Sequence, residues 1–305
     1  MSIEPKKAVS ISLGGASRDK RVEIDLLGQP VVMERIGTDG NVQRATTLFT
    51  ALDGRVDALG VGGIDLWVEL AGTRYPLHAA HKMVRGVRKT PVVDGTGLKN
   101  TLEAHVVRQL VAELGEAYAQ ARVMLTAAVD RFGMTRSFYE AGYEVVCADL
   151  MFTMGIPIPI HKLSTLKRVG RLALPLVGRF PISFIYPMGD KQEQIEPRFE
   201  RWYDWADVIA GDCHYIKRHM PDNLEGKVIV TNTTTDNDME AFRQRGVRHV
   251  MTTTPRLEGR SFGTNVFEAA LTAVAGKERP LTDQELDDMI GQLDIQPTVH
   301  SLQSE

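Results

Sequence analysis

The sequence has few cysteines, and they lie far apart. Cys147 and Cys213 are the only two, and neither belongs to a Cys/His cluster with metal-binding spacing. This usage is typical of a reducing compartment, so we expect a cytoplasmic location and no bound metal. Cys147 lies within an apolar stretch, where a small buried thiol is usual.

Long apolar runs are also missing. No stretch approaches the roughly 18 apolar residues that a membrane helix needs, and the first residues, MSIEPKKAVSISLG, lack the apolar core of a signal peptide. The most apolar region, 163–186, is interrupted by basic residues and prolines. We therefore expect no membrane partner, and we interpret residues 151–186 as a cap or as a contact between the subunits of a homo-oligomer.

The overall charge balance provides no field that favours nucleic acid or an anionic membrane. The 36 Lys and Arg and 39 Asp and Glu residues give a formal net charge of −3. The one basic stretch, 162–171, lacks the interleaved aromatic side chains that stack on bases, so no nucleic-acid partner is expected. With 43% hydrophobic and 25% charged residues, the 305-residue chain has the composition of a globular protein and the length of two domains.

A strand–helix–strand pattern lies in residues 121–150. An apolar strand precedes Asp130 and Arg131, a helix follows, and a second apolar run stops at Asp149. This is the layout of the first βαβ unit of a nucleotide-binding domain, but the usual glycine-rich loop is missing. Arg131 could meet a phosphate at the helix N-terminus. Asp149 could bind a ribose hydroxyl, or it could only cap the next turn.

Polar residues follow predicted strands in the first half of the chain. Gly14 and Gly15 follow a strand at 8–13, in a loop that could bind an anion or be only a tight turn. Asp65 follows a strand at 58–61 and a second Gly-Gly pair. Because open α/β sheets bind ligands at the carboxyl ends of their strands, Asp65 could be functional, and a turn or capping role is the alternative.

The segment 94–103, DGTGLKNTLE, carries the most chemistry of this half. A lysine such as Lys99 can polarise a carbonyl group or move a proton, and Asn100 can position a hydroxylated substrate. Asp94 lies at the start of the same turn. The alternative interpretation is a helix N-terminus with Thr101 as its cap.

The last third has regular strands that end in polar loops. A strand at 228–231 and another at 249–251 each lead into clustered threonines, which would form a hydroxyl-lined rim: Thr233, Thr234, Thr253 and Thr254. Arg256 and Arg260 could clamp a carboxylate or a phosphate. Asn265 opens the following helix, where it could bind substrate or serve only as an N-cap.

These patterns predict an α/β protein of two domains. Residues 1–118 would form a mixed α/β substrate-binding domain, in which 42–52 has the apolar spacing of a helix. Residues 119–276 would form a Rossmann-like domain with a doubly wound parallel sheet and an inserted cap at about 151–200. Residues 277–305 would form a C-terminal helix and a mobile tail.

The order of these parts resembles the shikimate/quinate 5-dehydrogenase superfamily and its relatives among the methylene-tetrahydrofolate and amino-acid dehydrogenases. Residues 98–102, LKNTL, look like the Asn-Thr substrate segment of that family. Lys82, preceded by Pro76 and His81, looks like its catalytic lysine, and residues 206–232 are similar to the late strands of its cofactor domain. The whole chain also resembles a bacterial family labelled quinate 5-dehydrogenase.

The resemblance implies an NAD(P)-dependent oxidoreductase that binds a small hydroxy or keto acid, such as a quinate-like or shikimate-like acid, in a cleft between the domains. Lys82 or Lys99 would move the proton, Asn100 would orient a hydroxyl group and Asp94 would assist. The expected contacts of NAD or NADP are Asp130, Arg131, Asp149 and the four threonines, and those of the substrate are Gly14, Gly15, Asp65, Arg256, Arg260 and Asn265.

A second hypothesis is a non-redox α/β protein that binds a phosphorylated or carboxylated ligand, as a sensor, a lyase or a transferase. The missing glycine-rich loop and the number of loops with Arg, Thr and Gly favour this hypothesis.

Overall fold

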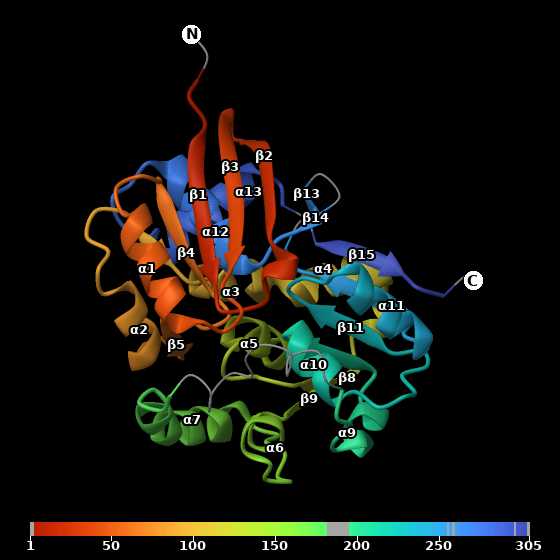
Figure 1. Ribbon diagram of the computed structural model, residues 1–305. Coiled ribbons are helices and arrows are strands. Elements are labelled where there is room, and N and C mark those ends of the chain that lie inside the picture. Colours follow the sequence, from red (N-terminus) through yellow and green to blue (C-terminus); the bar gives the residue numbers. More distant parts are fainter. Residues whose placement is uncertain (1–2, 182–194, 255, 258–259, 296, 304–305) are drawn as a thin grey trace. The chain divides into compact units, whose positions relative to one another are not determined.

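The computed structural model describes residues 3–181, 195–254, 256–257, 260–295 and 297–303 (Figure 1). The chain divides into two compact units, each made of three segments. Unit 1 consists of Met1–Thr101, Leu172–Gln192 and Phe262–Ile295, and unit 2 consists of Leu102–Arg171, Glu193–Ser261 and Gln296–Glu305. Both units contain mixed α/β structure with parallel strands, so the predicted α/β class is confirmed.

The boundaries between the two units differ from the predicted domain boundaries. The boundary expected after residue 118 lies inside unit 2, which begins at Leu102. Residues 262–295, expected to belong partly to the second domain and partly to a separate C-terminal segment, belong to unit 1. Local sequence patterns show what kind of element a segment forms, but not on which sheet the element packs.

Unit 1 is built on a five-stranded sheet with the order β2-β3-β1-β4-β7. The strands β3, β1, β4 and β7 are parallel, and β2 is antiparallel to β3. Because β1 lies between the parallel strands β3 and β4, the strand order reverses between β1 and β4. The strands are β1 (Lys6–Ser12), β2 (Lys20–Leu26), β3 (Gln29–Gly37), β4 (Ala58–Gly62) and β7 (Val92–Val93).

Helices and one short hairpin complete unit 1. The helix α1 begins after Asn41, whose side chain accepts a hydrogen bond from the backbone N–H of Arg44 and so caps the helix. The remaining elements of this unit are η1 (Ala16–Arg18), α1 (Val42–Leu52), β5 (Trp67–Leu70), β6 (Thr73–Pro76), α2 (His78–Val84), α3 (Thr96–Asn100), α12 (Thr264–Ala275) and α13 (Asp283–Gln292).

The helix α12 forms the centre of unit 1. It is buried on nearly all sides, as expected for a helix that is apolar around its whole circumference. It packs on β1, β3 and β4, and Figure 1 shows this blue helix against the red and orange strands. Asn265 donates a hydrogen bond to the hydroxyl of Ser10 at 2.5 Å, although 255 residues separate them.

Glycine in β4 allows this close packing. A Cβ atom on Gly60 would lie 2.8 Å from the backbone oxygen of Asn265 and 3.1 Å from the Cβ of Ser10.

We expect Gly60→Ala to lower the free energy of unfolding by about 1–3 kcal/mol, because a backbone group would have to move. Gly291→Ala is the matched control: no atom lies within 4 Å of its Cβ position, so the helix α13 should become more stable by up to about 1 kcal/mol. Urea unfolding measures both changes, and equal effects would contradict the packing argument.

Unit 2 is built on a six-stranded sheet with the order β15-β12-β11-β10-β8-β9. The first five strands in the chain are parallel, and β15 is antiparallel to β12. The strand order reverses between β8 and β10. The strands are β8 (Arg122–Leu125), β9 (Glu144–Cys147), β10 (Val208–Gly211), β11 (Val228–Thr231), β12 (His249–Thr252) and β15 (Thr298–Ser301). The expected mobile tail therefore contains an edge strand, which its polar sequence did not predict.

The helices of unit 2 follow its strands. A core cluster fills this unit, in which Tyr203 is fully buried and Phe152 packs edge-on against it. In the described residues no helix is long and apolar enough to cross a membrane. The elements are η2 (Leu102–His105), α4 (Val106–Leu114), η3 (Glu116–Tyr118), α5 (Phe132–Glu140), α6 (Asp149–Met154), α7 (Leu163–Val177), α9 (Glu200–Trp205), α10 (Cys213–His219), α11 (Asp236–Gln244), β13 (Arg256–Leu257) and β14 (Arg260–Ser261). The last residues of α7 belong to unit 1.

Candidate functional site

In each unit the predicted site residues gather where parallel strands end. In unit 1 they follow β1, β4 and β7, and in unit 2 they follow β8, β9, β11 and β12. The carboxyl ends of parallel strands share one edge of a sheet, and ligands of open α/β sheets bind outside this edge near the point where the strand order reverses. We describe the two edges separately.

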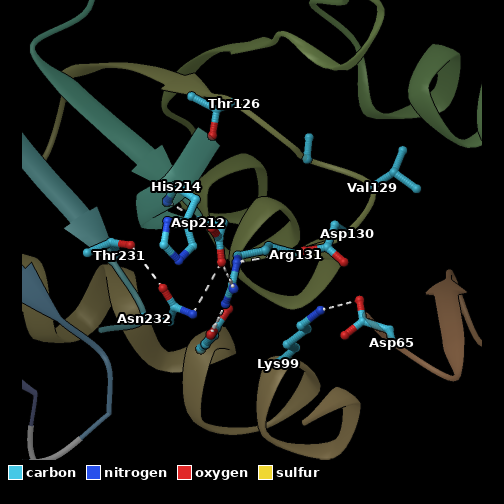
Figure 2. Close-up of polar contacts among 12 residues, drawn as sticks. Asp65, Lys99, Thr126, Val129, Asp130, Arg131, Asp212, His214, Thr231 and Asn232 are labelled. Atoms are coloured by element: carbon cyan, nitrogen blue, oxygen red, sulfur yellow. Dashed lines mark hydrogen bonds and ion pairs between the residues drawn. The ribbon is translucent and has the colours of Figure 1, made fainter. Parts of the chain in front are cut away.

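Lys99 and Asp65 form a buried ion pair at the edge of unit 1 (Figure 2). The Nζ atom of Lys99 lies 2.8 Å from Oδ2 of Asp65, and the two residues are only 6% and 8% exposed. Asp65 follows β4, and Lys99 lies in α3, which follows β7. Since β4 and β7 are paired parallel strands, the fold brings the two residues together. A lysine held beside a carboxylate in a buried place can give and take a proton.

Asp94 has a structural role at the same edge. Its carboxylate accepts hydrogen bonds from the backbone N–H groups of Leu66, Trp67 and Thr96 at 2.6, 3.1 and 3.0 Å. These bonds join the loop after β4 to the start of α3. Asp94 was expected to assist proton transfer, but its carboxylate is already bound by three amides, so it shapes the turn that carries Lys99.

Glu268 is a buried acid that the sequence did not indicate. It lies in α12, and its Oε2 accepts a hydrogen bond from the backbone N–H of Gly97 at 3.1 Å. Burial, together with the charge of Asp94, raises the pKa of Glu268 to about 8, although the amides of Leu98 and Gly97 act in the opposite direction. The residue stands within an apolar helix, 171 positions from Gly97, and therefore no local pattern marks it.

The raised pKa of Glu268 makes stability depend on pH. The folded protein favours the protonated acid, so this stabilisation is complete below the ordinary value of 4.5 and is lost as the pH rises towards 8. Over that range the free energy of unfolding should fall by on the order of 1 kcal/mol per pH unit. Glu268→Gln should remove this component, so urea unfolding at pH 5, 7 and 9 should show a flatter profile for the variant. Parallel profiles would contradict the argument.

Two arginines surround the glycine loop after β1. Arg35 of β3 donates hydrogen bonds to the carbonyl oxygen of Gly15 at 3.1 Å and to the hydroxyl of Ser12 at 3.0 Å. A Cβ atom on Gly14 would lie 2.6 Å from a guanidinium nitrogen of Arg18 and 2.8 Å from one of Arg35, so the two cations lie close together. Burial and the charge of Arg18 lower the pKa of Arg35 to about 10. Paired guanidinium groups favour a carboxylate or phosphate nearby.

Acidic residues balance part of this positive charge. The Oδ1 atom of Asp19 lies 2.9 Å from Nη1 of Arg35, and Asp39 accepts a hydrogen bond from the backbone N–H of Ala16 at 2.7 Å. The sequence indicated an anion site at Gly14 and Gly15. It did not indicate Arg35, because that residue belongs to a different strand and reaches the loop only through the pairing of β1 with β3.

Arg131 lies in a buried ion-pair cluster at the edge of unit 2. It pairs with Glu103, with Asp212 at 2.9 Å and with Asp130 at 3.9 Å, and its side chain is 3% exposed (Figure 2). Burial alone would lower the pKa of Arg131, but the charges of Glu103, Asp212 and Asp130 outweigh it and hold the pKa above its ordinary value. Its guanidinium group was expected to meet a phosphate, but carboxylates already bind it.

Asp212 connects the loops that follow β8 and β10, the two strands between which the strand order of unit 2 reverses. It follows β10, and it contacts the guanidinium of Arg131, the backbone N–H of His214 at 2.9 Å and the side-chain amide of Asn232 at 3.4 Å. Burial alone would raise its pKa, but Arg131 and His214 hold the pKa of Asp212 below its ordinary value. The carboxylates of Glu103, Asp130 and Asp212 thus surround the guanidinium group of Arg131 and would compete with an anionic ligand for it.

Asp149 closes the loop after β8. Its carboxylate accepts hydrogen bonds from the backbone N–H groups of Ala128 and Val129 at 3.2 and 2.8 Å. Burial raises the pKa of Asp149 to about 6, against the effect of these amides. In a dinucleotide-binding loop such amides point at phosphate oxygens. Here a carboxylate of the chain itself occupies them, so the residue caps this loop.

The predicted threonine rim is partly buried. Thr253 and Thr254 are no more than 1% exposed, and the hydroxyl of Thr254 donates to the carbonyl oxygen of Asn232 at 2.6 Å. These two residues join the ends of β11 and β12 and do not form an open rim. Thr233 and Thr234 are half-buried in the loop before α11.

Three of the remaining predicted residues lie on helices of unit 1, and Asn265 lies near Gly62 and Gly95 at the sheet edge described above. Lys82 is exposed on α2, and Asn100 is the half-buried last residue of α3. Asn265 is bound to Ser10. The side chains of Arg256 and Arg260 lie outside the described part of the structure. Within the described residues no group of three or more His, Cys, Asp or Glu side chains could hold a metal ion.

The buried cluster predicts a large effect of removing its cation. Arg131→Met would leave buried carboxylates without their partner, so we expect the free energy of unfolding to fall by about 3–5 kcal/mol. Arg136→Met, in the helix α5 that begins directly after Arg131, is the control. The side chain of Arg136 is 48% exposed and its ion pair with Glu140 is long, at 3.7 Å, so this change should alter stability by less than about 0.5 kcal/mol. Similar effects of the two changes in urea unfolding would refute the assignment.

The chain belongs to the family described as "Domain of unknown function (DUF8754)", whose model matches residues 97–302. A second model, "Domain of unknown function (DUF8753)", matches residues 7–94. No curated protein matches the chain in sequence.

Several solved structures are weakly similar to this one. The glucose-galactose binding protein GanP from Geobacillus stearothermophilus is 9% identical, with 98% of both chains covered and a TM-score of 0.37. The 5-methylthioribose transporter solute-binding protein from Thermotoga lettingae is 12% identical, with 98% of this chain and 86% of the other covered and a TM-score of 0.38. The NAD-dependent malic enzyme from Thermotoga maritima is 11% identical, with coverages of 93% and 84% and a TM-score of 0.35. At these scores they support no statement about ligand or activity.

Proposed function

We propose that the chain is an enzyme that acts on a small hydroxy or keto acid, as an NAD- or NADP-dependent oxidoreductase. The observation that carries the proposal is the buried pair of Lys99 and Asp65, with 2.8 Å between Nζ and Oδ2. Two buried opposite charges are not needed for stability, since apolar residues of similar volume are often as stable. A chemical role would account for the presence of this pair beside the carboxyl ends of β4 and β7.

Lys99 would transfer the proton. Its ammonium group would donate a hydrogen bond to the carbonyl oxygen of a keto acid and release the proton as the hydroxyl group forms; in the reverse direction its amine would take that proton. Asp65 would hold the ammonium group in position and favour its charged form. A bound nicotinamide would supply or accept the hydride.

The arginine-lined loop after β1 would hold the acid group of the substrate. Arg18 and Arg35 lie beside Gly14, and a carboxylate can accept paired hydrogen bonds from guanidinium groups. The loop follows β1, and Asp65 follows the neighbouring strand β4. Both features belong to unit 1 and to the same edge of its sheet, which supports one substrate site there.

Unit 2 supports the redox part of the proposal by its topology alone. The order β9-β8-β10-β11-β12 is that of a Rossmann-like, doubly wound sheet of the flavodoxin type, whose ligands bind at the reversal point. The loop after β8 does not fit a pyrophosphate, because Asp149 occupies its amides. A dinucleotide would have to be held by other groups.

A second candidate follows from this occupied loop. An enzyme without a dinucleotide, such as a lyase that removes a proton next to a carboxylate, would use the same lysine and the same arginines. The carboxylates around Arg131 also favour this alternative, because they occupy the guanidinium group that a phosphate would need.

The lysine is tested by substitution. With NAD or NADP and a panel of hydroxy and keto acids that includes quinate and shikimate, Lys99→Met should lower kcat at least about 100-fold, the usual contribution of a general acid or base. Asp65→Asn should lower kcat and change its pH profile. Lys89→Met, an exposed lysine of the same unit, should leave kcat unchanged.

Two further results separate the alternatives. Activity that survives Lys99→Met but is lost in Lys82→Met would overturn the assignment of the lysine. Isothermal titration with NAD and NADP that gives no heat, together with conversion of an acid substrate without a dinucleotide, would reject the oxidoreductase and leave the lyase.

A further inference from the structure

Exposed apolar side chains concentrate in one stretch of the chain. In the described residues eight large hydrophobic side chains are exposed, and six of them lie between residues 154 and 180. Single exposed apolar residues are normal, but a concentration of them marks an interaction surface. The six are Met154, Ile156, Ile158, Leu172, Leu176 and Phe180.

The helix α7 has two apolar faces. Leu166, Gly170 and Leu174 follow each other at four-residue spacing and are buried, so this face packs on the protein. The opposite face carries Leu172 and Leu176, which are 78% and 60% exposed. The inner face is buried against the protein, whereas Leu172 and Leu176 lie exposed to solvent.

The charge of this stretch has a single sign. Residues 150–189 contain no Asp or Glu, although the chain has 39 of them in total and a net charge of −3. The same stretch contains five basic residues: Lys162, Lys167, Arg168, Arg171 and Arg179. Arg168 and Arg171 are exposed on α7 beside Leu172.

We propose that the outer face of the helix α7, which carries Arg168, Arg171, Leu172 and Leu176, forms a docking surface for an anionic lipid bilayer. An interfacial helix combines Lys and Arg, which attract acidic headgroups, with Leu and Phe side chains, which enter the headgroup–acyl boundary. Leu172 and Leu176 supply the apolar part, and Arg168 and Arg171 supply the charge. The helix lies on the bilayer and does not cross it.

The positive charge of this surface favours an anionic bilayer over a second copy of the chain as the partner. In a symmetric dimer the same patch meets itself, and residues 154–180 of both copies would bring only positive charges together. An acidic lipid surface is complementary to the patch and also accepts its leucines. The proposal is independent of the proposed enzymatic function, because it uses none of the residues assigned to proton transfer or substrate binding.

The test is co-sedimentation of the full chain with vesicles. Phosphatidylcholine vesicles that contain about a third phosphatidylserine should bind the protein at least tenfold more strongly than pure phosphatidylcholine vesicles, and salt should weaken the binding. The double variant Leu172→Glu/Leu176→Glu should lose at least tenfold in affinity, and so should Arg168→Glu/Arg171→Glu. The exposed Ile3→Glu, at a residue that is 57% exposed outside the patch, should bind like the wild type.

Three outcomes would overturn the proposal: no binding to the acidic vesicles, unchanged binding of both double variants, or an equal loss in Ile3→Glu. Sedimentation velocity on the same proteins tests the alternative that the surface joins two copies of the chain. A dimer of the wild type that Leu172→Glu/Leu176→Glu converts to a monomer, with no vesicle binding, would assign the surface to self-association. Circular dichroism shows whether each variant is folded, which is expected because the substituted side chains face solvent.

Discussion

The contact of α12 with α3 is the interaction on which unit 1 depends. Through Glu268 the helix fixes the amide of Gly97, and through Asn265 it holds β1. It thereby sets the position of the short helix that carries Lys99. Because Glu268 is buried and its pKa is raised to about 8, this buried helix also contains a group whose charge changes near neutral pH. The helix α12 therefore both packs against the sheet and carries a carboxyl group that can gain or lose a proton.

The two sheets share a strand order but differ in electrostatics. In both, the first parallel strand lies between the second and the third, which places loops from two directions at one edge. At this edge unit 1 has separate ion pairs, Lys99 with Asp65 and Arg35 with Asp19, whereas unit 2 surrounds Arg131 with several carboxylates. Topology thus provides two similar places for a ligand, and the side chains make them chemically different.

Elements with a local signal could be predicted from the sequence, and long-range contacts could not. The helix at 42–52 and the strand at 228–231 have the predicted bounds, because apolar spacing determines them. Asp65 and Lys99 were recognised as strand-end residues, but their pairing depends on β4 and β7 lying side by side. Arg35 and Glu268 reach their sites from elements distant in sequence, and β15 is held by backbone pairing with β12, which leaves no mark in side-chain type.

The interleaving of the units has a consequence for synthesis. Domains usually fold in order as the chain leaves the ribosome, the N-terminal one first. Here α12, at Thr264–Ala275, fills the core of the unit that begins at the N-terminus. The first sheet therefore has an uncovered apolar face until nearly the whole chain has been made. Unit 2 likewise obtains its edge strand β15 from Thr298–Ser301, so neither unit can assemble fully from the first 260 residues alone.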